Sequence, residues 1–98
     1  MRIRYSLQAL ADLEAIFEYF DTHAPATAPA LRSAMELAIN GLEAFPYLAA
    51  ATDEPAVRVL TLARYRYRIY YTVDAKNEVV TVLHIRHTSR RPLRSGSR

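Results

Sequence analysis

The fold of this chain is decided by residues 57–91, which read VRVLTLARYRYRIYYTVDAKNEVVTVLHIRHTSRR. This stretch contains three runs rich in β-branched and aromatic residues, which are typical of strands on a half-buried sheet, at 57–62, 66–73 and 79–87. Residues 74–78 separate the last two runs and consist mostly of residues that tolerate tight turns. We therefore predict that these two runs pair antiparallel as a hairpin.

Side chains in a strand alternate between the two faces of a sheet, so Arg66 and Arg68 share one face and Ile69 and Tyr71 share the other. Interleaving arginine with tyrosine combines guanidinium groups that bind anions with rings that stack. We predict that a basic sheet surface contacts the target of the chain, and its members are Arg64, Arg66, Arg68, Arg86, His87, Arg90 and Arg91.

Charge is distributed unevenly along the chain, although the formal net charge is only +3. Residues 1–54 contain 3 basic and 8 acidic residues, a net charge of −5, whereas residues 55–98 contain 10 basic and 2 acidic residues, a net charge of +8. Such a division indicates that one face meets a polyanion or an acidic partner. The plainer interpretation is a solvated arginine-rich surface, and the interleaved tyrosines favour binding over it.

The first half of the chain predicts a short strand and two helices. Residues 2–5 alternate apolar and basic side chains, as a short strand does, and Ser6 is placed to cap the helix that follows. Apolar residues recur every three or four positions over residues 7–22 and again over residues 29–44, which predicts two amphipathic helices. Prolines in residues 23–29 separate them, so we expect an antiparallel helical hairpin.

The order strand, helix, helix, strand, strand, strand predicts one α+β domain over residues 1–92, followed by a flexible C-terminal tail at residues 93–98. The helical hairpin should pack on one face of a mainly antiparallel sheet, which leaves the opposite face exposed and basic. The predicted core comprises Leu10, Leu13, Phe17, Phe20, Leu31, Met35, Leu42, Ile69, Tyr71, Leu83 and Ile85.

Composition disfavours several classes of chemistry. The chain has no cysteine, and its only glycines are Gly41 and Gly96, so it offers no thiolate metal site and no glycine-rich phosphate loop. Its N-terminal residues carry charges every few positions and resemble neither a signal peptide nor a membrane span. We therefore expect a cytoplasmic protein without metal, cofactor or membrane contact. His87, at a strand end, fits either a hydrogen-bonded structural histidine or a general acid or base.

The chain resembles the toxins of the RelE/ParE superfamily of bacterial type II toxin-antitoxin modules, and most closely their ParE-like plasmid-stabilisation branch. The segments that carry this resemblance are YSLQALADLEAIFEYF, RVLTLARYRYRIYYTVD and VVTVLHIRHTSRRP. It covers residues 2–92 and includes Arg58 at the start of a strand and the strand-end His87 followed by basic residues. The resemblance implies a β-α-α-β-β-β fold and a toxin that arrests growth until a co-expressed antitoxin binds it.

The two branches of the superfamily differ in target. The resemblance to the ParE-like branch implies a binding inhibitor of DNA gyrase that is not an enzyme, so no catalytic residue is expected. The RelE-like alternative is an endoribonuclease that cuts messenger RNA in the ribosome, and its active groups here would be His87, Arg86 and Arg68. No tyrosine follows Tyr71 and the only lysine, Lys76, lies in a predicted turn, which favours the ParE-like interpretation.

The charge division also predicts an antitoxin whose binding segment is acidic and amphipathic. Exposed ion pairs contribute only about 0–1 kcal/mol each, so this segment needs apolar anchors as well. Ile16, Tyr19 and Leu37 fall outside the predicted core stripes of the two helices. We expect these three side chains to contact the antitoxin in a toxin–antitoxin hetero-oligomer.

Overall fold

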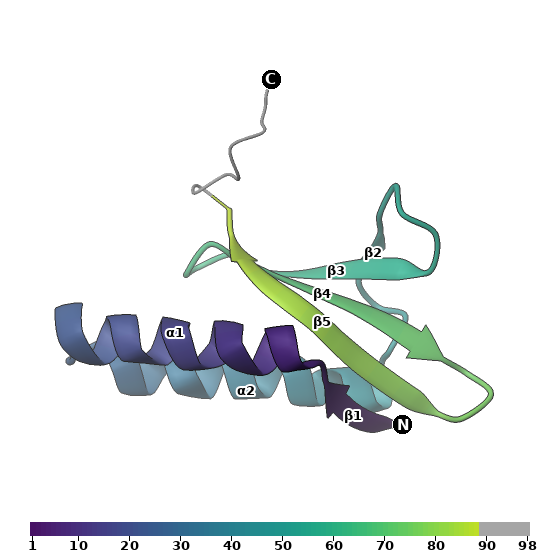
Figure 1. Cartoon of the computed structure of the whole chain (residues 1–98), viewed down its shortest axis with the longest axis horizontal. Coiled ribbons are helices and arrows are strands. Elements are labelled where there is room, and N and C mark those ends of the chain that lie inside the picture. The colour runs from purple at the N-terminus through teal and green to yellow at the C-terminus, as the bar shows by residue number, and fades with distance from the viewer. Residues whose placement is uncertain (89–98) are drawn as a thin grey trace.

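The computed structural model describes residues 1–88 and contains two helices packed on a five-stranded sheet (Figure 1). The elements are, in chain order, β1 (Arg2–Tyr5), α1 (Leu7–His23), α2 (Ala28–Ala44), β2 (Ala50–Ala51), β3 (Val57–Leu62), β4 (Tyr67–Asp74) and β5 (Val79–His87). The predicted α+β order is confirmed, and β2 is a short addition within a segment predicted as loop. The predicted tail at residues 93–98 lies outside the described residues, as do Arg90 and Arg91.

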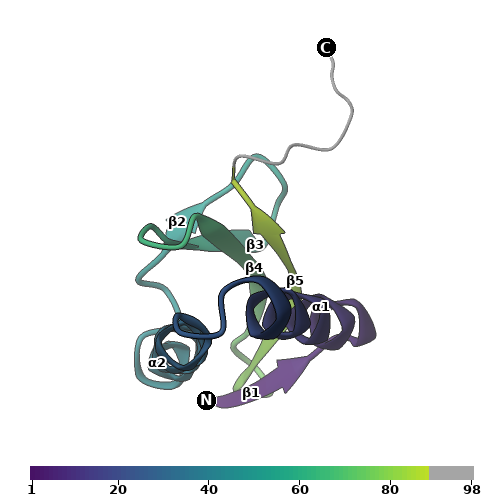
Figure 2. The ribbon, with the colours of Figure 1, turned by 90° about the vertical axis from the view of Figure 1, so that its left-hand side faces the viewer.

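The sheet is mixed, with the strand order β1-β5-β4-β3-β2. β3, β4 and β5 form an antiparallel meander, and β1 joins the edge of β5 in parallel, with Arg2 opposite Val79 and Tyr5 opposite Val82. Both helices lie on the same face of this sheet (Figure 2). Within residues 1–88, no element covers the opposite face, which we call the outer face.

Ser6 joins β1 to α1 and ties both to β5. Its side-chain oxygen accepts the N–H of Ala9 at 3.0 Å, which confirms the predicted helix cap, and its hydroxyl donates to the carbonyl of Leu83 at 2.6 Å. The backbone N–H of Ser6 also donates to the carbonyl of Val82 at 2.9 Å. These bonds bring the first turn of α1 close to the sheet, where the small side chain of Ala9 is fully buried.

The core agrees with most of the prediction. The predicted core residues that are buried are Leu31, Met35, Leu42, Ile69, Tyr71 and Ile85. Leu13, Phe17 and Phe20 are half-buried and pack against this core. The prediction for Leu10 is wrong, because the buried stripe of α1 runs through Ala9 and Ile16 and leaves Leu10 49% exposed.

A bulge between β4 and β5 changes which side chains face the helices. Tyr71 lies opposite Val82, but Tyr70 lies opposite His84, so Leu83 has no partner residue on β4. Val82 and Ile85 are both buried, whereas Leu83 between them is only half-buried and belongs to neither core cluster. The prediction that Leu83 lies in the core is therefore wrong.

Candidate target-binding face

The centre of the outer face is a row of three side chains, one from each strand of the meander. Val59 of β3 lies opposite Tyr70 of β4, which lies opposite His84 of β5. The ring centroids of Tyr70 and His84 are 4.6 Å apart, and the two rings are tilted by 40°. All three side chains are half-buried although no described element covers them, because they bury surface against one another. We call them the central row.

An arginine pair borders the central row. Arg68 of β4 lies opposite Arg86 of β5, and like charges placed directly opposite each other destabilise a sheet. Asp12 of α1 offsets this repulsion, because its Oδ2 lies 3.3 Å from Nη1 of Arg86. The same oxygen accepts the backbone N–H of Ile85 at 2.8 Å. Asp12 of α1 therefore holds one side of Arg86, and both Arg68 and Arg86 remain exposed.

Arg64 and Arg66 lie in the turn between β3 and β4. Arg66 has φ 63°, which is the left-handed backbone conformation. Residues other than glycine and asparagine adopt this conformation at a cost in free energy. This conformation explains why β4 begins at Tyr67, one residue later than predicted. The carbonyl of Arg66 accepts the N–H of Thr88 at 2.7 Å, which fixes the end of β5 beside the turn. Two exposed guanidinium groups thus lie at one end of the sheet.

His87 does not lie with the arginines of the outer face. It is opposite Tyr67, and the two ring centroids are 5.0 Å apart in an edge-to-face arrangement. Tyr67 is buried in the core on the side of the helices, so His87 belongs to that side, whereas Arg68 and Arg86 belong to the other. The structure therefore brings together Arg68 and Arg86 of the predicted basic sheet surface and separates His87 from them.

Tyr70 and His84 are a pair that the sequence analysis missed. Burial lowers the pKa of His84 below its ordinary value of 6.5, and the nearby Arg86 lowers that pKa further, against the opposing influence of Asp12 and Glu54. His84 is consequently neutral at neutral pH. The pairing of Tyr70 with His84 depends on the bulge, because an unbroken register would place Leu83 opposite Tyr70.

Stability should depend on pH through His84. Its pKa is lower in the folded chain than in the unfolded chain, so the unfolded chain binds more protons below a pH near 6.5. We expect stability to fall as pH is lowered through this range and the His84→Gln variant to lose part of that dependence. Urea unfolding at several pH values between about 8 and 5 measures it. His23→Gln is the control, and an identical pH profile for wild type and His84→Gln would contradict the prediction.

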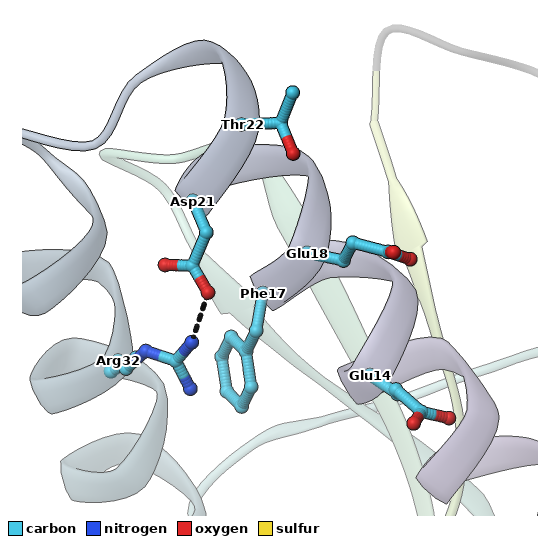
Figure 3. A pocket seen from close by; sticks show the side chains of 6 residues that line it. All are labelled: Glu14, Phe17, Glu18, Asp21, Thr22 and Arg32. Carbon is cyan, nitrogen blue, oxygen red and sulfur yellow. Dashed lines mark hydrogen bonds and ion pairs between the residues drawn. The ribbon is translucent and has the colours of Figure 1, made fainter.

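A second candidate surface is an open pocket of about 380 Å³ at the seam of α1 and α2. Figure 3 shows the side chains that line it, which are Glu14, Phe17, Glu18, Asp21, Thr22 and Arg32. Arg32 of α2 donates to Asp21 at 2.7 Å, and its guanidinium carbon lies 4.4 Å from the ring centroid of Phe17. Glu14 and Glu18 point away from α2. This surface is therefore acidic, with an aromatic wall.

The three residues predicted to contact an antitoxin do not form one exposed set. Tyr19 is 47% exposed and Leu37 is 76% exposed, as their positions outside the core stripes predict. Ile16 is only 8% exposed and packs in the main core, so its prediction as an accessible contact is wrong. Ala9 and Ile16 lie on the face of α1 that is buried against the sheet. The small side chain of Ala9 lets this face of the helix approach the sheet closely.

An apolar loop after α2 was also missed. Phe45 and Leu48 are 63% and 77% exposed. The backbone on either side of Leu48 is held in place, because Arg58 donates to the carbonyl of Ala49 at 2.7 Å and the hydroxyl of Tyr71 donates to the carbonyl of Pro46 at 2.7 Å. Exposed apolar side chains grouped on a backbone that is held in place suit a protein-binding surface. Their only signal in the sequence is large apolar residues in a predicted loop.

Two further classes of site are absent from the described part of the chain. No helix within residues 1–88 is both long and apolar enough to cross a membrane. The same residues contain no group of three or more histidine, cysteine or acidic side chains that could hold a metal ion.

Comparison with known proteins identifies the family of the chain. Residues 3–92 match the family described as the ParE toxin of the type II toxin-antitoxin system parDE. No curated protein matches the chain significantly. Among solved structures, the chain is similar to one of the chromosomal ParDE toxin-antitoxin system from P. aeruginosa, with a TM-score of 0.75 and 23% identity, covering 91% of this chain and 97% of that chain.

Two more distant structures have the same fold. The isolated E. coli RelE toxin gives a TM-score of 0.59 at 15% identity, with 94% of this chain and 88% of that chain covered. The RelBE2 toxin-antitoxin complex from Mycobacterium tuberculosis gives 0.60 at 20% identity, with 88% of each chain covered. Since the family match extends over residues 3–92 and the fold agrees, this chain belongs to the ParE toxin family of type II toxin-antitoxin systems.

Proposed function

We propose that this toxin arrests growth by binding DNA gyrase through the outer face and its adjacent turn, and that a cognate antitoxin blocks this binding. The family match supports a gyrase-directed toxin, because the resemblance to the ParE-like branch implies that target. The outer face supports the location, because no helix or strand within residues 1–88 covers it and it carries Arg68 and Arg86 beside the central row. Arg64 and Arg66 extend this surface into the turn.

The separation of His87 from the arginines is the observation that favours gyrase binding over RNA cleavage. A general acid or base must reach the reacting group within hydrogen-bonding distance, about 2.6–3.2 Å. His87 lies on the helix side of the sheet with Tyr67, whereas Arg68 and Arg86 lie on the outer face. Groups on opposite faces of one sheet cannot act on the same phosphate, so the RelE-like nuclease has less support.

The test of this function uses purified gyrase and the full chain. We expect the toxin to inhibit supercoiling of relaxed plasmid, and induced expression to cause filamentation and a DNA-damage response. Addition of the antitoxin encoded beside the toxin should restore supercoiling. Unchanged gyrase activity together with cleavage of messenger RNA in a purified translation system would replace this function by the RelE-like one.

The antitoxin is proposed to contact two surfaces of opposite charge. The pocket at the helical hairpin is lined by Glu14, Glu18 and Asp21, so an acidic segment would be repelled there. The expectation of an acidic segment along this hairpin is therefore revised, and a cationic segment with apolar side chains suits Tyr19 and Leu37 better. An acidic segment suits the arginines of the outer face, where it would block the target. Phe45 and Leu48 provide further apolar contacts.

The charge of the hairpin pocket can be tested by association kinetics. Reversing Glu14 and Glu18 to lysine should slow association with the antitoxin, and the loss should shrink at high salt, because rim charges act mainly on the association rate. The matched control reverses Glu36 and Glu43, two exposed acidic residues of α2 that do not line the pocket. Equal slowing by both pairs of substitutions would contradict a specific contribution of the pocket.

Arg66 is predicted to favour target binding at the expense of stability. Its left-handed backbone costs about 1 kcal/mol for a residue with a side chain, and Arg66→Gly should recover part of that cost. The variant should therefore unfold at a higher urea concentration and yet bind gyrase more weakly than wild type. Ala56 and Glu78 also have positive φ and directly precede a strand, and the control Ala56→Gly should stabilise without weakening binding. Full binding by Arg66→Gly would exclude Arg66 from the interface.

A further inference from the structure

We infer that the outer face receives an acidic protein segment with an apolar anchor, and that the anchor packs on the central row of Val59, Tyr70 and His84. This inference rests on the proposed function, because it assigns the segment to gyrase itself and not to the DNA that gyrase holds. The central row is then the apolar centre of the interface, which the arginines alone do not provide.

The central row has the features of the centre of a protein interface. Its three side chains are half-buried on a face that no described element covers, and Tyr70 and His84 are held against each other at 4.6 Å. They therefore lose little conformational freedom when a partner packs on them. Thr61 and Thr72 flank Val59 and Tyr70 on the neighbouring rows and add small polar groups. Interfaces commonly combine such a fixed aromatic centre with a charged rim.

The rim of the outer face is predominantly basic. Arg68 and Arg86 border the central row on one side. At the edge of the sheet, Arg2 and Arg4 of β1 are exposed, and they alternate with Ile3, which packs against the core. Two acidic side chains lie near this face: Asp74 already accepts hydrogen bonds from the backbone N–H and side-chain nitrogen of Asn77 at 3.1 and 2.8 Å, and Glu54 is near enough to His84 to act on its pKa. A segment with several carboxylates complements this rim.

The geometry favours protein over nucleic acid as the occupant. Single strands bind to sheets through bases that stack on free aromatic faces. The rings of Tyr70 and His84 pack on each other, and the third member of the row, Val59, is aliphatic. Arg86 is partly neutralised by Asp12, which lowers the positive charge available to a phosphate backbone. A carboxylate segment with one apolar side chain needs neither a free ring nor a dense cationic track.

The test measures binding of the full chain to purified gyrase without DNA. Tyr70→Thr removes the ring but keeps a residue suited to strands, and it should weaken binding about tenfold or more, as loss of an interface anchor does. Arg68→Glu should weaken binding most at low salt. Two controls match these changes elsewhere: Leu10→Ala removes an exposed apolar side chain from α1, and Lys76→Glu reverses a charge in the β4–β5 turn. Both controls should bind as wild type does.

The outcomes separate this inference from the proposed function. Weaker binding by Tyr70→Thr and Arg68→Glu but not by the controls supports it, and Val59→Thr replaces Tyr70→Thr if that variant fails to fold. Wild-type affinity in both outer-face variants overturns the inference and leaves gyrase binding intact. Binding that requires DNA also overturns it, in favour of nucleic acid on this face. Absence of gyrase binding with and without DNA overturns the proposed function, and the inference with it.

Discussion

Replacing Ile69 with alanine is expected to destabilise the toxin by about 2–5 kcal/mol, the range measured for truncation of fully buried branched residues. Ile69 is 0% exposed at the centre of the sheet, opposite Leu60 of β3 and Ile85 of β5. A domain of this size has only about 5–15 kcal/mol of stability in total, so the variant should lose much of it. The shift of the urea midpoint, at an unchanged slope, measures the effect.

The control for Ile69→Ala is Leu37→Ala, which removes the side chain of an apolar residue that is 76% exposed. It should change stability by no more than about 0.5 kcal/mol, as surface substitutions usually do. If Ile69→Ala were as stable as Leu37→Ala, the core would not lie between the sheet and the helices.

The second large effect is expected at Asp12. Asp12→Ala removes the acceptor of the Ile85 N–H and leaves this partly buried donor unpaired, which costs about 1–3 kcal/mol. It also releases Arg86, whose Nη1 lies 3.3 Å from the same carboxylate. We therefore expect a lower urea midpoint and, because Arg86 can now move away from Arg68, weaker binding of gyrase per folded molecule. Unfolding curves and binding measurements on the same preparation separate the two effects.

Two variants sharpen the Asp12 prediction. Asp12→Asn keeps an oxygen that can accept the Ile85 N–H but removes the charge, so it should retain more stability than Asp12→Ala. Glu14→Ala removes a carboxylate from the exposed side of the same helix and should leave both stability and binding unchanged. Equal losses for the alanine and asparagine variants would mean that the charge, and not the hydrogen bond, provides the stabilisation.

Local patterns predicted the elements of this fold closely. β1, β3 and β5 begin and end at the predicted residues, because alternation and β-branched composition are signals carried by each segment alone. α1 begins at Leu7 because Ser6 supplies a helix cap that can be recognised in the sequence. The two-residue strand β2 was not predicted, since the pairing of Ala50 with Val59 creates it and Ala50 has no strand preference of its own.

The candidate site could be predicted only in part, because its geometry depends on contacts between distant segments. The alternation of Arg66, Arg68 and Tyr70 indicated a basic face, and the register places Arg68 opposite Arg86. The pairing of Tyr70 with His84 follows from the bulge at Leu83, which no local pattern encodes. The burial of Ile16 likewise depends on how closely Ala9 approaches the sheet.

The bonds of Ser6 have a consequence for the time at which the toxin becomes active during its synthesis. The hydroxyl of Ser6 reaches the carbonyl of Leu83, 77 positions further along the chain, and among the described strands β1 pairs only with β5. Contacts between such distant residues form late in folding, because the long intervening loop must first be closed. A growing chain therefore leaves β1 without a partner until residues 79–82 have been made. We therefore expect activity to require that β5 has been made and the sheet has closed, and an antitoxin already in the cell could bind the sheet at that point.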